Sequence, residues 1–132
     1  MTQVKLHGLS KSFAGKEQVN AVQDLNLEID SGKITALLGP SGCGKTTTLK
    51  MIAGLLQPTA GDITFDGKSV LGTPPERRGA AMVFQNYLLF PYMSVGDNVS
   101  FGLRMRHMDK ELIRKKVAEI LELVKLPGYE ER

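Results

Sequence analysis

The feature that most constrains this chain is a glycine-rich octapeptide, Gly39-Pro40-Ser41-Gly42-Cys43-Gly44-Lys45-Thr46. It matches the pattern G-x-x-x-x-G-K-[ST] at every fixed position. The apolar residues 34–38 before it predict a strand, and residues 47–53 after it predict a helix that stops at a glycine. A strand, this loop and a helix in that order are the context in which the pattern binds phosphate.

The residue types of this loop predict how a nucleotide is held. Its three glycines open backbone conformations closed to other residues, so that the loop amides converge on anionic oxygens. The helix that follows adds free N–H groups and the positive end of its dipole. We expect Lys45 to reach the β- and γ-phosphates, Thr46 to ligate Mg²⁺, and Thr47 to offer a hydroxyl to the α-phosphate. The loop therefore predicts binding of ATP with Mg²⁺.

Length and composition narrow the class of protein further. A chain of 132 residues suggests one domain of ordinary size. The net charge of +3 is too mild to indicate a nucleic-acid partner. The single cysteine, Cys43, allows no internal disulfide and suits a reducing compartment. No signal peptide is recognised and no apolar run approaches the roughly 20 residues that span a bilayer, so we expect a cytoplasmic chain.

Alternating apolar and polar residues predict an antiparallel β-layer around residues 39–46, which we call the phosphate loop. The first segment, residues 4–13, is interpreted as an edge strand that ends in a turn at Gly15 and Lys16. Asp66 and Gly67 are a hairpin signal. Further short strands are predicted at residues 19–22, 25–29 and 62–65.

Two residues outside the loop are candidates for the nucleotide site. Phe13 suits stacking on adenine, or else a place in the core or in a turn. Residues 80–84 predict a buried strand with Gln85 at its carboxyl end. Ligands gather outside the carboxyl ends of strands in open α/β sheets, which places Gln85 on the side of Lys45. Its amide would hold Mg²⁺ or orient a water there, or else simply close the strand.

The last third of the sequence predicts a loop and two helices. The aromatic residues Tyr87, Phe90 and Tyr92 indicate either a partner contact or a locally packed loop. Ser94 is a predicted N-cap for a helix to about residue 103, and Asp109 for a helix from 110 to about 124. The second helix has one apolar stripe at helical spacing, made of Ile113, Val117, Ile120, Leu121 and Val124.

Several stretches taken together resemble one protein family. They are Ser12-Phe13, residues 39–47, Met51-Ile-Ala-Gly-Leu55, Pro75-Glu-Arg-Arg78, Met82-Val-Phe-Gln85, Leu89-Phe-Pro91, Ser94-Val95, Asp97-Asn98-Val99 and Phe101-Gly-Leu103. The chain resembles the ATP-binding subunit of an ABC transporter, and within that family the importers for sugars, glycerol phosphate, polyamines or ferric iron. The resemblance implies an α/β, RecA-like P-loop NTPase core with an N-terminal antiparallel β-layer in residues 1–93. It also implies the start of a helical subdomain in residues 94–132.

The resemblance also implies roles for particular residues. Phe13 matches the aromatic of the A-loop, which stacks on adenine. Gly39 to Thr47 match the Walker A loop, and Gln85 matches the Q-loop glutamine, which contacts Mg²⁺ and the attacking water. The segment after Gln85 lies where the family meets its transmembrane permease subunits. The family pairs two ATPase subunits around ATP on the inner face of the membrane and couples ATP hydrolysis to solute import.

Some motifs of the family are not found in these residues. They are the signature motif L-S-G-G-Q, a Walker B strand ending in Asp-Glu, the D-loop and the switch histidine. No catalytic residue is therefore assigned beyond the supporting Gln85, and we expect a chain cut before the signature motif that is inactive alone. The alternatives are a non-catalytic interaction fragment and another P-loop kinase or NTPase.

Overall fold

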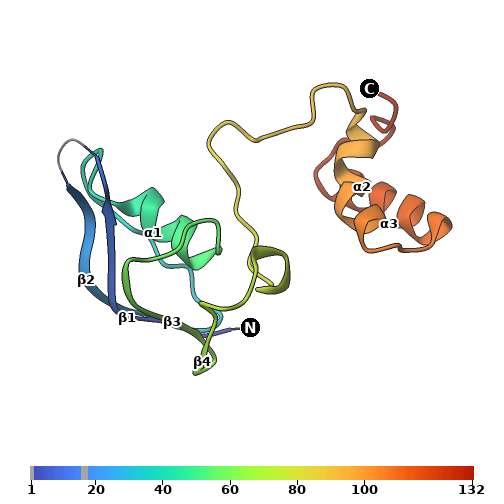
Figure 1. Cartoon of the computed structure of the whole chain (residues 1–132). Helices are drawn as coiled ribbons and strands as arrows, with labels where there is room; N and C mark the ends of the chain where they lie inside the picture. The colour runs from blue at the N-terminus through green and yellow to red at the C-terminus, as the bar shows by residue number, and fades with distance from the viewer. Residues whose placement is uncertain (1, 16–17) are drawn as a thin grey trace. The chain divides into compact units, whose positions relative to one another are not determined.

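A computed structural model describes residues 2–15 and 18–132 of the chain, so Lys16 of the predicted turn lies outside the described residues. The chain divides into two compact units, Met1–Val83 and Phe84–Arg132. The boundary expected after residue 93 stays a prediction. The elements in chain order (Figure 1) are β1 Val4–Phe13, β2 Val19–Ile29, α1 Lys45–Ile52, β3 Ala60–Phe65, β4 Lys68–Ser69, the 3-10 turn η1 Pro75–Arg77, α2 Val95–Met105 and α3 Lys110–Leu123.

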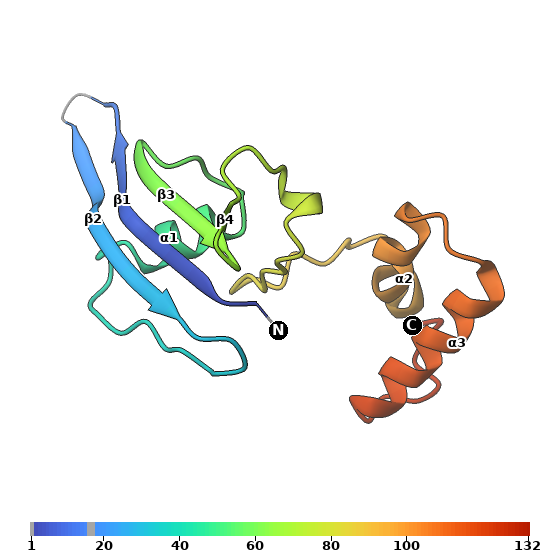
Figure 2. The same cartoon turned by 90° about the horizontal axis from the view of Figure 1, so that it is seen from below.

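The first unit is built on an antiparallel sheet with the strand order β2-β1-β3-β4 (Figure 2). The prediction that residues 4–13 form an edge strand is wrong, because β1 pairs with β2 on one side and β3 on the other. Alternation of apolar residues reports which face of a strand is buried, and it carries no information about how many neighbours the strand has. The predicted hairpin at Asp66 and Gly67 is confirmed, and it joins β3 to β4.

The core of the first unit lies between the sheet and α1. Leu6 of β1 pairs with Leu27 of β2 and with Ile63 of β3, which puts a row of apolar side chains across the sheet. Met51 of α1 packs on this row and is fully buried. The core cluster consists of Leu6, Leu9, Val22, Met51, Ile63 and Val70.

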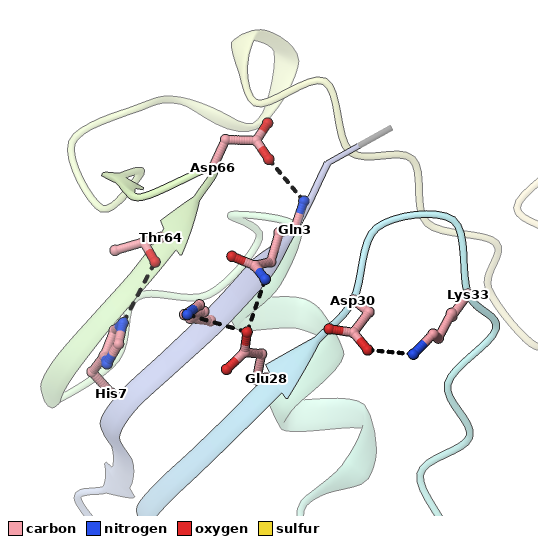
Figure 3. Close-up of polar contacts among 8 residues, drawn as sticks. Gln3, His7, Glu28, Asp30, Lys33, Thr64 and Asp66 are labelled. Atoms are coloured by element: carbon pink, nitrogen blue, oxygen red, sulfur yellow. Dashed lines mark hydrogen bonds and ion pairs between the residues drawn. The ribbon is translucent and has the colours of Figure 1, made fainter.

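Polar side chains of these strands contact one another outside the apolar core (Figure 3). Glu28 of β2 is paired with Lys5 at 3.1 Å and accepts a hydrogen bond from Gln3 at 2.8 Å. His7 lies 3.5 Å from the hydroxyl of Thr64 on β3. Exposed pairs of this kind contribute little to stability, so the fold depends on the apolar face.

Two predicted strands do not form. Residues 34–38 and 80–84 are without regular secondary structure, and no described strand pairs with either segment. The side chains of Ile34, Leu38 and Val83 are almost fully exposed. A strand exists only when its backbone groups bond to a neighbour, and the sequence of one segment does not supply that neighbour. The predictions of a strand at residues 34–38 and of a buried strand at residues 80–84 are therefore wrong.

The second unit contains the two predicted helices, and both predicted N-caps are confirmed. The Ser94 hydroxyl accepts a hydrogen bond from the Asp97 amide, and the Asp109 carboxylate accepts from the amides of Glu111 and Leu112. Within the predicted stripe of α3, Val117 and Leu121 are buried, whereas Ile113, Ile120 and Val124 are more exposed. Among the described residues, no helix is both long enough and apolar enough to cross a membrane.

Candidate nucleotide-binding site

The phosphate loop leads directly into α1, whose first turn offers its amides without a competing side chain. Gly44 is the N-cap, at φ 89°, and no side chain caps the helix. The first turn contains no acidic residue. The Thr48 amide already bonds to the Gly44 carbonyl at 2.8 Å, which fixes the helix from its first residue. Uncapped amides and the positive end of a helix dipole together favour an anion.

Lys45 is held at the loop by backbone carbonyls. Its Nζ donates to the carbonyl oxygens of Gly39 and Pro40, both at 2.7 Å. The Sγ atom of Cys43 lies 3.4 Å from the same ammonium. No ion pair joins Lys45 to any carboxylate in the described part of the chain. The ammonium is therefore held within the loop by neutral groups, and no acidic side chain in the described residues neutralises its charge.

Two glycines of the loop have no room for a side chain. A Cβ atom on Gly44 would lie 2.3 Å from the Ala21 carbonyl oxygen of β2. A Cβ atom on Gly39 would lie 2.7 Å from the Cys43 sulfur. At Gly44 the loop backbone thus approaches the backbone of the sheet more closely than a residue with a side chain permits, whereas at Gly39 the Cys43 side chain would have to move.

The threonines that follow Lys45 differ in their surroundings. Thr48 is buried, and its hydroxyl donates to the Gly44 carbonyl at 3.0 Å, which is a structural role. Thr46 is exposed and Thr47 is half-buried, and no hydrogen bond joins either hydroxyl to another described residue. The two hydroxyls expected to meet Mg²⁺ and the α-phosphate are therefore uncommitted within this part of the chain.

The register of the sheet places Phe13 at the same end as the phosphate loop. Phe13 pairs with Val19 at the start of β2, and Gly44 contacts Ala21 two residues further along that strand. The ring is 42% exposed, and the Lys11 ammonium lies 5.3 Å from its centre. An exposed aromatic here is compatible with stacking on a base, which stays a prediction.

A hollow of about 450 Å³ lies between β2 and the phosphate loop. It is lined by both apolar and polar groups, among them Asn20, Val22, Leu37, Leu38, Gly44 and Lys45. Three segments line the pocket: residues 36–38 before the loop, the loop itself, and β2, the strand that pairs with β1 at Phe13. The assignment of this space to a nucleotide stays a prediction.

Gln85 belongs to the second unit, so its expected place beside Lys45 stays a prediction. Its side chain is exposed. In the described residues no group of three or more His, Cys, Asp or Glu side chains forms a metal site. The predicted contacts of Thr46 and Gln85 with Mg²⁺ stay predictions.

No role is predicted for Arg78 from the sequence, where it belongs only to the motif Pro75-Glu-Arg-Arg78. Arg78 is 6% exposed, and its Nη1 donates to the carbonyls of Met51 and Ile52 at the end of α1. Its Nε donates to the Thr73 carbonyl at 2.9 Å. Burial lowers the pKa of its guanidinium below the ordinary value. Gly54, just after α1, leaves room for this side chain, because a Cβ atom there would lie 2.6 Å from Arg78 Nε.

The segment 87–93 is exposed and apolar. Tyr87 is 76% and Tyr92 fully exposed. Tyr87 and Leu88 both have positive φ, at 59° and 49°, a conformation that non-glycine residues rarely adopt. Strained backbone beneath exposed aromatic side chains is typical of functional loops.

Comparison with known proteins identifies the family. The family model described as ABC transporter matches residues 22–132. The chain belongs to the ABC transporter family. Members of this family bind ATP with a metal ion. Because the chain belongs to this family, the alternative of another P-loop kinase is excluded.

Among curated relatives of this ABC chain, a spermidine/putrescine import ATP-binding protein PotA from Thermobifida fusca is 50% identical over 124 residues. That match covers 93% of this chain and 32% of the relative. The protein of the same name from Acidothermus cellulolyticus is 49% identical, over 98% of this chain and 34% of the relative. The chain thus spans about a third of the length of the relatives it matches.

Solved structures support the same fold. A dimeric post-hydrolysis state of an ATP-binding cassette with ADP and Pi matches with a TM-score of 0.85 at 29% identity. A dimeric bacterial ABC transporter cassette matches with a TM-score of 0.85 at 28% identity. Each match covers 98% of this chain and 60% of the other. The predicted fold class, a P-loop NTPase with an antiparallel β-layer, is therefore confirmed.

Proposed function

We propose that this chain supplies the nucleotide-binding part of an ABC import ATPase and binds Mg²⁺-ATP at residues 39–47. The observation that supports this most directly is the Lys45 ammonium, fixed by the carbonyls of Gly39 and Pro40 beside the uncapped start of α1. Lys45 would neutralise the β- and γ-phosphates, and the first-turn amides of α1 would bind their oxygens. Thr46 would hold the metal, and Phe13 would stack on the adenine.

Calorimetric titration with Mg²⁺-ATP tests this proposal. We expect Lys45→Ala to abolish the heat of binding, because a phosphate-bound ammonium is lost. Lys50→Ala is the matched control, since Lys50 lies in the last turn of the same helix, away from the loop. Binding that survives Lys45→Ala, or that is lost equally in Lys50→Ala, would contradict the proposed site.

The role of Phe13 has its own experiment. Phe13→Ala should weaken ATP binding by about 1–3 kcal/mol, while Phe13→Tyr should preserve it, because stacking needs only an aromatic face. Inorganic triphosphate should bind the parent and Phe13→Ala forms equally. An equal loss of triphosphate affinity would show that Phe13 shapes the loop rather than contacting the base.

In the whole protein we propose that Gln85 orients the attacking water beside the metal during phosphoryl transfer. A second ATPase subunit would complete the site, as the dimeric cassettes suggest. The exposed segment after Gln85 would contact the transmembrane permease subunits and hold the protein at the inner face of the membrane. A Gln85→Ala subunit that hydrolyses ATP at the parental rate would contradict the first of these roles.

The names of the relatives favour polyamines as the transported solutes. The test is uptake of labelled putrescine by the transporter in vesicles, with maltose and glycerol phosphate as competitors. Absence of putrescine uptake by vesicles that do take up labelled maltose or glycerol phosphate would contradict this assignment.

A further inference from the structure

The side chain of Asn98 ties a whole loop to the start of α2. Its Oδ1 accepts the Phe90 amide at 2.9 Å. Its Nδ2 lies 3.2 Å from the carbonyl oxygen of Phe90, 3.1 Å from that of Met93 and 3.0 Å from that of Ser94. The two amide protons of Asn98 are thus shared among three carbonyls, and both ends of the loop 90–94 are fixed to one side chain.

Other contacts fix the same loop to the same helix. The rings of Phe90 and Phe101 have centres 4.5 Å apart, which packs the first residue of the loop on α2. The Met93 amide bonds to the Phe90 carbonyl at 3.2 Å, and Ser94 caps the helix. The loop and α2 are therefore joined within the second unit by both hydrogen bonds and ring packing.

The surface that this clamp presents is apolar and uncharged. Residues 84–96 contain no Asp, Glu, Lys, Arg or His. Leu89 is 69% exposed and Tyr92 is fully exposed, although both are large side chains. Large exposed apolar side chains gathered in one short segment are typical of a protein contact site, and the lack of charge fits an apolar partner segment.

We propose that Asn98 is a positioning residue that preforms the loop 90–94 for docking onto the permease subunit. This proposal rests on the proposed function, which supplies the partner. A loop already fixed in its bound conformation loses less conformational entropy on binding.

The first measurement is amide hydrogen exchange in this chain. In Asn98→Ala the Phe90 amide should exchange about tenfold faster, the value of one hydrogen bond. Asn98→Asp keeps an acceptor for that amide and loses the donors, so its Phe90 amide should stay protected. Exchange that accelerates throughout α2 and α3 in Asn98→Ala would show a general structural role and overturn the proposal.

The second measurement is docking. The whole ATPase subunit carrying Asn98→Ala or Asn98→Asp is titrated onto its permease in vesicles, and we expect the affinity to fall about tenfold in both. Its affinity for Mg²⁺-ATP should not change, because Asn98 lies outside the phosphate loop. The control is Asn26→Ala, which removes a hydrogen-bonding asparagine from β2 in the other unit.

The outcomes separate the two proposals. If the parental subunit binds its permease and Asn98→Ala binds equally well, the role of Asn98 is wrong and the docking function stands. If the parental subunit does not bind a permease at all, the docking function is wrong and the role of Asn98 falls with it. An equal loss of ATP affinity in Asn98→Ala would likewise overturn the positioning role.

Discussion

Replacing Gly44 by alanine should destabilise the first unit for two separable reasons. Gly44 has φ 89°, and an L-residue in a left-handed conformation costs about 1–2 kcal/mol. In addition, the new Cβ atom would lie 2.3 Å from the Ala21 carbonyl oxygen and 3.0 Å from Val22 Cγ2. Those atoms belong to the backbone and core of β2, so α1 and β2 must separate by roughly 1 Å to reach ordinary contact.

Gly42 provides a matched control within the same loop. It also has positive φ, at 82°, but a Cβ atom there would meet nothing within 4 Å. Gly42→Ala should therefore show the backbone strain alone, about 1–2 kcal/mol. Gly44→Ala should lose a further 1–3 kcal/mol, roughly the cost of overpacking a core.

Scanning calorimetry of the two variants measures this difference. For a unit of this size, 1 kcal/mol lowers Tm by about 4–8 °C, so the two variants should differ by roughly 5–20 °C. The three tyrosines, Tyr87, Tyr92 and Tyr129, all lie in the second unit, so their fluorescence reports that unit separately. Equal losses in both variants would refute the argument from close approach, and so would a change confined to the tyrosine signal.

Two further predictions concern helix ends. Arg78→Met should destabilise the first unit by about 2–3 kcal/mol, because three charge-assisted hydrogen bonds to carbonyls are lost and the relief from desolvation offsets only part of them. Urea unfolding against Arg77→Met, an exposed neighbour expected to change stability by less than about 0.5 kcal/mol, measures this, and equal effects would contradict it. Asp109→Ala should cost the second unit about 1 kcal/mol by removing the N-cap of α3, while Asp109→Asn should retain most of it. Tyrosine-detected unfolding measures both variants, and an Asp109→Ala variant as stable as the parent would show that the cap contributes nothing.

The sequence by itself determined the local chemistry of this protein. The phosphate loop, the caps at Ser94 and Asp109 and the turn at Asp66 and Gly67 follow from residues within a few positions of one another. Glycine conformations and capping bonds depend on near neighbours, so a pattern of residues suffices to predict them. Resemblance to the ABC family then added an expected role to Phe13 and to Gln85.

Only the tertiary structure decided which distant groups meet. It placed β1 between two neighbours, left residues 34–38 unpaired, and buried Arg78 against carbonyls 27 and 26 residues away. It also showed that the side chain of Asn98, for which the sequence predicted no contacts, is hydrogen-bonded to the backbone of the apolar loop 90–94. A backbone carbonyl is present at every residue and leaves no mark in the sequence, so its partner is known only when the chain has folded around it.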